Sequence, residues 1–496
     1  MKIFCNLLVA ILLPVFVYGQ NLQTPLEKNQ YQALSSYNDI GLFLQQAAGM
    51  NAQIVLSSIG KSVAGRDIRL VKVSNSQASD KAKLNILIFA QQHGNEPSGK
   101  EGLLLLIKQL AEGKGSDWLN EVNLYLIPQL NPDGGEMNNR RNQNNADLNR
   151  DHLLLSQPET QALHAFVHEN PMDVTLDMHE YFPHGDTSAT FRYTRNTDVQ
   201  FGTLTNINIH PDVLGMCQEK LLPQVIAQVR EKGFSSREYL IGSVVFDKRI
   251  RRSTVDINDG RQSFGIQNTL SFISEGLNGK TPTDRIEHRA NSQCATAEAL
   301  ILASMAHAES IRLIRERGVK SLEQGTAPDS VAVQMEHYKG NASFWMPLLS
   351  LATGKDTLVE IKEYHTLIKP RLNVRKPIGY LVPASDSLLC AISARHGVKS
   401  EKLPKGKWNF VQYEFTGMLK DSIEDWPFDL AQVSPIKMGK FKDLDKYLFV
   451  PVNQKKGLML VLLLEPQSMF GIVNEKKYAE LLTQNKKWPV LRVEKK

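Results

Sequence analysis

The stretch 84–100 constrains the fold of this 496-residue chain more than any other. It runs from the apolar segment Leu84–Ala90 into a tight Gly-Asn corner and then into a leucine-rich helix that begins with Pro. A continuous apolar run bounded in this way predicts a buried central strand followed by a helix. His93 and Glu96 lie three residues apart at the corner, so both side chains can point at one metal ion above the end of the strand. A loop that merely carries a His and a Glu is the plain alternative.

Strands and helices alternate over the first two thirds of the chain, which predicts an α/β fold with a mixed central sheet flanked by helices. The expected strands are 53–60, 67–73, 84–90, 123–128, 173–179 and 268–276. The expected helices are 26–49, 99–112, 158–170, 209–233 and 285–317. The first two strands flank a turn and so should form an antiparallel pair at one edge of the sheet. Between these elements we expect a turn at 131–135 and polar loops at 136–150 and 249–261.

The sequence pattern changes at about Ser321, where short β-like runs with many Lys begin. These runs are 357–361, 379–382, 408–413 and 458–464, with one expected helix at 388–397. They predict a second, mostly β C-terminal domain at 321–496, which follows a catalytic domain at 20–320. No metal or nucleophile motif occurs in it, so its expected role is structural or substrate-handling.

The N-terminal segment 1–19 has a basic start, an apolar centre and a small residue at its end, Gly19. This pattern predicts a cleaved signal peptide and a secreted or periplasmic protein. A membrane anchor is the alternative, but the apolar run is short and contains Pro14, so we expect no stable membrane span in the mature chain. The formal net charge is +6, with Lys and Arg spread along the chain, which argues against a nucleic-acid partner.

Two further residues extend the candidate site. His179 ends the expected strand 173–179, a position like that of His93, and is the natural third metal ligand. His184 is the competitor for this role, although its Pro-Gly surroundings predict a loop. Glu275 ends the expected strand 268–276 and is a candidate general base, because apolar walls raise the proton affinity of a carboxylate. A capping role for Glu275 is the alternative.

Five motifs occur in a fixed order along residues 26–309 and together resemble the zinc carboxypeptidases of the carboxypeptidase A family. They are His93-x-x-Glu96, Asn131-Pro-Asp-Gly, Asp147-Leu-Asn149-Arg150, Asp177-Met-His179 and Phe272-Ile-Ser-Glu275. The resemblance implies one zinc ion per chain, held by His93, Glu96 and His179 with a water as fourth ligand. It makes Glu275 the base that takes a proton from that water. It also makes Asp147 the acid that orients the first zinc-binding His.

The same resemblance assigns the substrate-binding residues. Asn149 and Arg150 match the pair that binds the terminal carboxylate, which implies a peptide substrate with a free C-terminal carboxylate. Arg140 lies in the interval where the family has an Arg that stabilises the oxyanion, and the neighbouring Arg141 competes for this role. The implied activity is hydrolysis of the C-terminal peptide bond of peptides by a zinc-activated water.

Two departures from the family suggest altered substrate handling. Asn95 stands between the zinc His and Glu, where the family often has an Arg. A Tyr that closes over the substrate is expected before the base, but no Tyr lies between Tyr239 and Glu275, and that region offers only Ser263 and Phe264.

Two other functions stay open. The motifs around His93 and Asp147 also resemble zinc deacylases of N-acyl amino acids, such as the aspartoacylase and succinylglutamate desuccinylase group. A non-catalytic protein that binds peptides or glycans is the third possibility. The longer catalytic region and the Asn131-Pro-Asp-Gly turn favour the peptidase, while retention of all three ligands and the base argues against a binding protein.

Overall fold

The computed structural model describes residues 22–75, 83–183, 192–242, 249–326, 328–341, 344–424 and 426–496. The expected signal peptide at 1–19 lies outside these ranges. Within them, no helix is both long and apolar enough to cross a bilayer.

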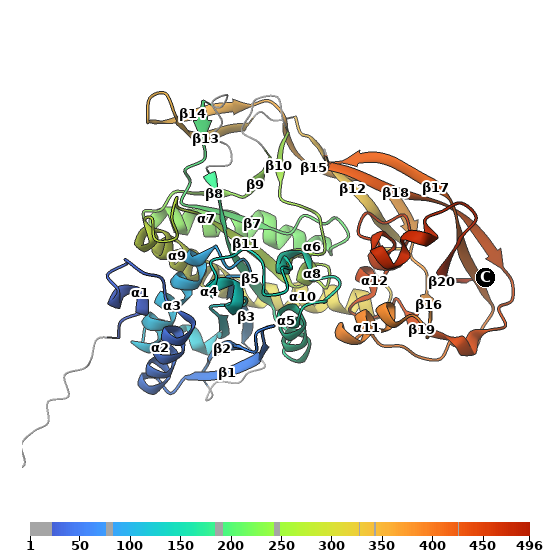
Figure 1. The fold of residues 1–496 in the computed structure, drawn as a ribbon, viewed down its shortest axis with the longest axis horizontal. Helices are drawn as coiled ribbons and strands as arrows, with labels where there is room; N and C mark the ends of the chain where they lie inside the picture. The colour runs from blue at the N-terminus through green and yellow to red at the C-terminus, as the bar shows by residue number, and fades with distance from the viewer. Residues whose placement is uncertain are drawn as a thin grey trace, which may run out of the picture.

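An eight-stranded mixed sheet forms the centre of the N-terminal part of the molecule (Figure 1). In spatial order its strands are β1 (Ile54–Lys61), β2 (Asp67–Val73), β4 (Val122–Ile127), β3 (Leu84–Ala90), β5 (Val174–Tyr181), β11 (Leu270–Leu277), β7 (Val199–Thr203) and β8 (Ser236–Glu238). The four middle strands β4, β3, β5 and β11 run parallel, while β1 and β2 form an antiparallel pair at the edge. The α/β prediction, with its edge pair and its central strand, is confirmed.

Helices cover both faces of this sheet. They are α1 (Pro25–Lys28), α2 (Tyr37–Met50), α3 (Pro97–Ala111), α4 (Pro132–Glu136), α5 (Pro158–Glu169), α6 (Pro211–Gly215), α7 (Leu222–Glu231), α8 (Gly260–Gly265), α9 (Ile286–Ala306) and α10 (Ala308–Glu323). Successive side chains of β3 alternate between two cores, because a strand points neighbouring residues to opposite faces. Ile86 and Ile88 pack with α3 and α9, whereas Leu87 and Phe89 pack with α5 and α8. Burial on both faces explains why β3 reads as an unbroken apolar run.

Four local predictions for this part were wrong. The expected helix 285–317 is two helices, α9 and α10, which meet at His307. The expected helix 26–49 is two helices, because Gln30 and Tyr31 adopt positive φ and Ser36 caps a new helix start by accepting a hydrogen bond from the Asp39 N–H. The expected turn at 131–135 is the one-turn helix α4, with the Asn131 side chain as its N-cap. The expected polar loop 249–261 contains strand β10 (Ile250–Arg252), which pairs with β9 (Leu240–Ile241).

The C-terminal part is mostly β, as predicted. Its strands are β12 (Ser330–Lys339), β13 (Phe344–Ser350), β14 (Asp356–Ile361), β15 (Tyr364–Arg375), β16 (Gly379–Pro383), β17 (Trp408–Ile423), β18 (Trp426–Met438), β19 (Tyr447–Pro451) and β20 (Lys487–Lys495). The expected helix 388–397 is present as α11 (Ser387–Arg395). The expected strand 458–464 is instead helix α12 (Gly457–Leu464), which is buried on every side. Periodicity cannot separate a fully buried helix from a buried strand, and Leu and Met favour helices.

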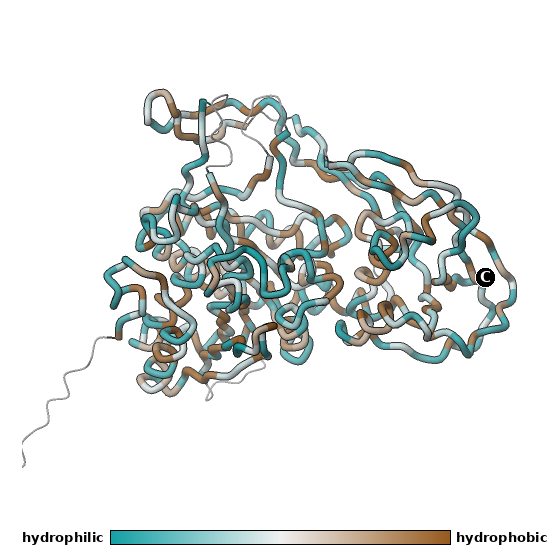
Figure 2. Tube along the Cα trace, in the orientation of Figure 1, coloured by the Kyte–Doolittle hydropathy of each residue, from teal (hydrophilic) through white to brown (hydrophobic). Residues whose placement is uncertain are grey.

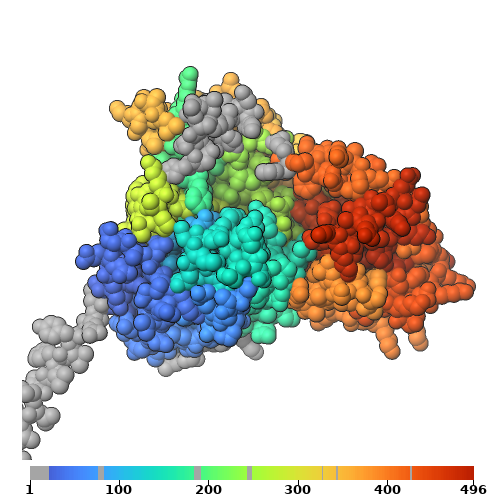
Figure 3. All heavy atoms as spheres, in the orientation of Figure 1, coloured from blue at the N-terminus to red at the C-terminus, as the bar shows by residue number. Residues whose placement is uncertain are grey.

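The two parts of the molecule share sheets and a core. Strand β10 pairs with β15, and strand β6 (Tyr193–Thr194) pairs with β13, so segments of the N-terminal part complete C-terminal sheets. The largest hydrophobic cluster runs from Leu26 through α9 to α12 and Trp488. Brown, hydrophobic segments occur in the interior of both parts in Figure 2, and the C-terminal part lies directly against the rest in Figure 3. The domain boundary at 320/321 stays a prediction.

Candidate metal centre

His93, Glu96 and His179 meet at the carboxyl ends of β3 and β5. His93 and Glu96 follow β3 directly, and His179 is the sixth residue of the neighbouring parallel strand β5. All three side chains are buried, and their potential ligand atoms lie within 4.8 Å of one another. Adjacent parallel strands end at the same edge of a sheet, which explains how residues far apart in the sequence converge here. His184, the competitor for the third ligand, lies outside the described residues.

The donor atoms are close enough to surround one ion. The Nδ1 atom of His93 lies 2.9 Å from Oε1 of Glu96, and Nδ1 of His179 lies 3.0 Å from Oε2 of the same carboxylate. The two Nδ1 atoms are 3.1 Å apart. Two imidazole nitrogens and a carboxylate that face one another are the donor set of three-ligand zinc sites with an open position.

A carboxylate holds the other nitrogen of each ring. Nε2 of His93 lies 3.0 Å from Oδ1 of Asp147, and Nε2 of His179 lies 2.9 Å from Oδ1 of Asp177. Such partners fix the ring orientation and leave Nδ1 free to bind a metal. The sequence predicted this position for Asp147 but assigned no role to Asp177. The signal was present, because Asp177 and His179 are two residues apart on one strand and therefore share a face.

The electrostatics of the cluster favour a cation. Burial by itself raises the pKa of Glu96, but the His93 and His179 rings outweigh it and hold this pKa well below its usual range. Burial lowers the pKa of His179, yet Asp177 and Glu96 together raise it well above its ordinary value. Three carboxylates around two imidazoles therefore attract positive charge, whether protons or a metal ion. The residues present fit a bound divalent metal.

The loop that carries His93 is packed tightly against helix α4. A Cβ atom on Gly94 would come within 2.0 Å of the carbonyl carbon of Gly134, so only glycine fits there. The Asn131 side chain donates a hydrogen bond to the carbonyl oxygen of Gln92 at 3.0 Å. The Asn-Pro-Asp-Gly motif thus supports the loop that presents the first two ligands.

Glu275 lies beside the cluster on the next strand. It pairs in register with His179 across β11 and β5, so both side chains project from the same face of the sheet. Only 8% of the residue is exposed. Burial raises the pKa of Glu275 to about 7. A carboxyl group with this proton affinity, next to a metal centre, suits general acid–base work near neutral pH.

Tyr239 is a site residue that sequence reasoning missed. Burial raises the pKa of Tyr239 well above its ordinary value, and the nearby Glu275 carboxylate adds to this rise. Glycine makes this approach possible, because a Cβ atom on Gly202 would lie 2.9 Å from both the Tyr239 Cβ and the Ile273 side chain. The interval between Tyr239 and Glu275 contains no Tyr, and Tyr239 itself, at the start of that interval, is the Tyr that lies near the base.

The two candidate arginines in the polar loop behave differently. Nη1 of Arg140 lies 3.4 Å from Oε1 of Glu96, and its Nη2 lies 3.0 Å from Oδ2 of Asp147. Arg141 instead donates to the carbonyl oxygen of Asn145 within its own loop. The structure therefore brings Arg140, and not Arg141, to the metal centre.

Asn149 and Arg150 lie on one side of the centre. The Asn149 Nδ2 atom is 3.3 Å from Nε2 of His179, and its Oδ1 accepts the backbone N–H of Gly260. Arg150 is exposed, and its Nη1 donates to the carbonyl oxygen of Asn149 at 2.7 Å. Among the described residues, no carboxylate forms an ion pair with Arg150. Its guanidinium is thus open to a ligand.

Comparison with known proteins relates this chain to zinc carboxypeptidases. The family model described as zinc carboxypeptidase matches residues 40–209, a span that includes all three candidate ligands. Carboxypeptidase 2 of Trichophyton rubrum is 22% identical over 448 residues, which is 87% of this chain and 82% of that protein. The match over residues 40–209 supports a catalytic domain like that of the carboxypeptidase A-like zinc carboxypeptidases. The chain is accordingly a metallocarboxypeptidase, a hydrolase that acts on peptide bonds.

Other members of the zinc carboxypeptidase family are similar over shorter stretches. Carboxypeptidase SOL1 of Arabidopsis thaliana is 34% identical over 170 residues, or 28% of this chain and 35% of that protein. A solved metallo-carboxypeptidase from Pseudomonas aeruginosa has 20% sequence identity and a TM-score of 0.43, over 57% of this chain and 71% of that one. The matched range of the family model ends before Glu275, so the base rests on the geometry above.

Proposed function

We propose that this metallocarboxypeptidase removes the C-terminal residue of peptides with one zinc ion held by His93, Glu96 and His179. The observation that carries the proposal is the convergence of these three donors next to the buried carboxylate of Glu275. When bound, zinc would supply a Lewis acid that polarises the scissile carbonyl and lowers the pKa of the attacking water.

The acid–base work falls to Glu275. Its ionised carboxylate accepts a proton from the attacking water and then returns that proton to the leaving amine. We assign to the nearby Tyr239 hydroxyl a hydrogen bond to this carboxylate, which would limit the directions in which it can point. A base held at one position lowers the entropy lost on reaching the transition state.

Substrate recognition falls to Arg150 and Asn149. The exposed guanidinium of Arg150 offers paired donors that match the two oxygens of a terminal carboxylate. Arg140 lies nearer the metal ligands, where negative charge develops on the carbonyl oxygen during attack, and we assign it to that oxyanion.

Product analysis tests the proposal. The purified protein with one equivalent of zinc should release single C-terminal amino acids from a mixed peptide library, and a chelator should abolish the release. Hydrolysis of N-acyl amino acids with no release from peptides would instead identify a deacylase. A Glu275→Gln variant that binds zinc serves as the matched inactive control.

We also propose that the protein is exported. The segment 1–19 supports a cleaved leader, which would deliver the enzyme to a secreted or periplasmic compartment. N-terminal sequencing of the mature protein should start close to Gln20. Retention of Met1 in the active protein would contradict export by cleavage.

A further inference from the structure

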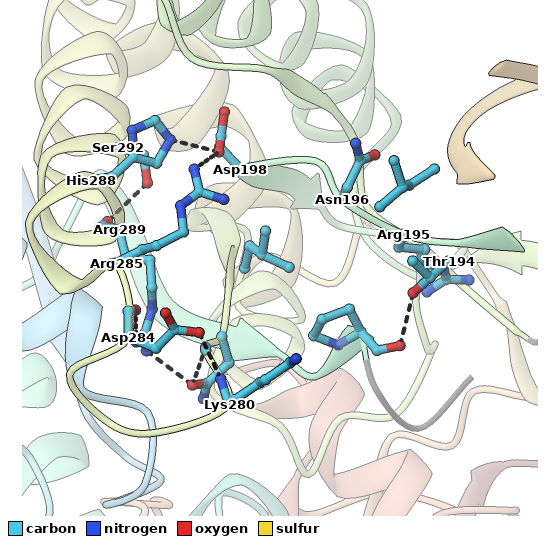
Figure 4. A pocket seen from close by; sticks show the side chains of 15 residues that line it. Thr194, Arg195, Asn196, Asp198, Lys280, Asp284, Arg285, His288, Arg289 and Ser292 are labelled. Atoms are coloured by element: carbon cyan, nitrogen blue, oxygen red, sulfur yellow. Dashed lines mark hydrogen bonds and ion pairs between the residues drawn. The ribbon is translucent and has the colours of Figure 1, made fainter. Parts of the chain in front are cut away.

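A cavity of about 200 Å³ lies near the ends of β5 and β11, the strands that carry His179 and Glu275, and none of the groups discussed above lines it (Figure 4). Its walls come from the ends of β5 and β11, the start of α9, the segment before β7, and strand β13. The residues that matter for the argument are Pro183, Thr194, Leu277, Asn278, His288 and Leu349.

The cavity shares a wall with the metal-binding loop. Asn278 lines the cavity, and its Nδ2 donates to the carbonyl oxygen of Asn95 at 3.3 Å. Arg289 also lines it and holds Glu180 through an ion pair of 2.6 Å. The backbone N–H of Glu180 in turn donates to Glu96. Two short chains of contacts therefore link the cavity wall to the loop of the metal ligands.

Sheet register places the cavity along the path of an extended substrate. Glu275 pairs with His179, and two residues further on Leu277 pairs with Tyr181. Leu277 lines the cavity. Two residues of extended chain advance roughly 7 Å, for a strand and for a substrate alike. Asn149 contacts His179 and Gly260, and neither Asn149 nor Gly260 lines the cavity. We therefore expect a peptide whose C-terminus is bound at Asn149 to extend past the metal centre toward the cavity.

The chemistry of the walls selects an apolar group. Two polar side chains of the cavity wall already have partners: Nε2 of His288 donates to Asp198 at 2.7 Å, and the Thr194 hydroxyl donates to the carbonyl oxygen of Pro183 at 3.1 Å (Figure 4). Nε of Arg195 has no partner, but protein atoms cover it. Leu277 and Leu349 offer apolar surface to a ligand, and the exposed Lys280 also lines the cavity. A polar side chain placed against the two leucines would lose its hydration without gaining hydrogen bonds from them.

The size of the cavity fits one side chain. Pockets for whole small molecules occupy about 300–1,000 Å³, which exceeds the 200 Å³ found here. Leu349 belongs to β13 of the C-terminal part and pairs with Thr194 of β6. The β13–β14 hairpin thus brings the C-terminal part over the catalytic half (Figure 1).

We propose that this cavity binds one apolar side chain of the peptide substrate, two or three residues before the bond that is cut. Leu349 lines the cavity, so the C-terminal part takes part in substrate selection. The inference rests on the proposed peptidase function, and it adds a preference that lies away from the C-terminal residue.

Three substrates with the same last two residues test it. One is an N-blocked dipeptide that cannot reach the cavity, and the other two are tetrapeptides with Leu-Leu or Gly-Gly at the preceding positions. The wild-type enzyme should prefer the Leu tetrapeptide by about tenfold or more in kcat/KM, the usual scale for apolar side-chain recognition. Leu349→Trp fills the cavity and should bring the Leu to Gly ratio close to one, while dipeptide turnover changes by less than about twofold.

Two further variants make the result decisive. Leu358→Trp, at a residue that is 62% exposed on the neighbouring strand β14, is the matched control and should keep the wild-type ratio. Leu349→Ala enlarges the cavity and should shift the preference from Leu to Phe, which keeps the test valid if the Trp variant does not fold. A ratio near one in the wild type, or a ratio unchanged by both Leu349 variants, overturns the inference. Absence of dipeptide turnover by the zinc-loaded wild type would instead overturn the proposed function itself.

Discussion

Glu275 is the residue on which turnover depends most directly. Glu275→Gln keeps the shape of the side chain but cannot accept a proton, so kcat should fall at least about a hundredfold while zinc content and melting temperature stay unchanged. Burial raises the pKa of Glu275 to about 7, and the active form is the ionised one. Activity should therefore rise with pH to a plateau. The midpoint should lie at or below about 7, since a bound cation favours the carboxylate.

This pH profile is a direct check. Stopped assays of kcat/KM from acidic to neutral pH should show the rise in the wild type and no such rise in the residual activity of Glu275→Gln. Full turnover in the variant would move the base to another residue.

Tyr239 should act through Glu275 and not through the substrate. Tyr239→Phe removes one hydrogen bond to a charged group, worth about 1.5–3 kcal/mol, so kcat should fall about tenfold or more while KM changes little. Loss of the donor also destabilises the carboxylate, which moves the acidic limb of the profile to higher pH. The exposed Tyr338 of β12 offers a matched control, and Tyr338→Phe should leave both kcat and the limb in place. A rise in KM alone would place Tyr239 at the substrate.

Variants of Arg150 and Arg140 should differ in how they act on a matched pair of substrates, a peptide with a free C-terminal carboxylate and its C-terminal amide. Arg150→Lys loses the paired donors and should weaken a free-acid peptide by about 1.5–3 kcal/mol, while its C-terminal amide changes little. Arg140→Ala should reduce turnover of the acid and the amide alike, because the charge that Arg140 meets develops only in the transition state. Equal losses on both substrates for Arg150→Lys would leave an endopeptidase or amidase as the better description.

At the scale of elements, the metal centre depends on the contact between the His93–Glu96 loop and helix α4. Gly94→Ala places a methyl group against the backbone of Gly134, which cannot move without shifting α4. The loop must shift instead, so zinc affinity should fall by tenfold or more while the two histidines and the Glu are all still present. Gly49→Ala is the control, because nothing lies within 4 Å of a Cβ atom there. Isothermal titration of zinc into both variants measures the difference, and equal affinities would show that the loop tolerates the displacement.

The elements also show what sequence could predict. The order of strands and helices around β3 and β5 could be predicted from apolar runs and turn residues. The predicted strand ends also put His93 and His179 at the same edge of the sheet, where the structure has them. Helix α12 could not be recognised, because a run of Leu, Met and Val that is buried on all sides carries no periodicity. The choice between Arg140 and Arg141 was undecidable for a related reason: both lie in one polar loop, and only the folded loop turns one of them toward Glu96. Tyr239 reaches Glu275 through a gap that Gly202 leaves on β7, which is a property of packing and not of spacing.

At the scale of the whole molecule, the N-terminal and C-terminal parts share one hydrophobic core. This core bears on whether the two predicted domains fold independently. Leu458–Leu464 of α12 belong to the same hydrophobic cluster as α3, α9 and the sheet. Burial of these residues contributes to both parts at once, so neither part can lose it independently. The cluster predicts that the two parts unfold together.

Calorimetry with and without zinc tests this prediction. A ligand that binds only the folded state stabilises it by about 4 kcal/mol at a thousandfold excess over Kd, and this stabilisation extends to every segment that unfolds in the same cooperative step. The full chain should therefore show a single transition, and removal of zinc by a chelator should shift the whole of it downward by several degrees. His179→Ala, which lacks one of three ligands, should melt at the chelated temperature and respond to neither zinc nor chelator. Two transitions, of which only one responds to zinc, would show instead that the C-terminal part is an independent folding unit and that the boundary near Ser321 divides the core as well as the sequence pattern.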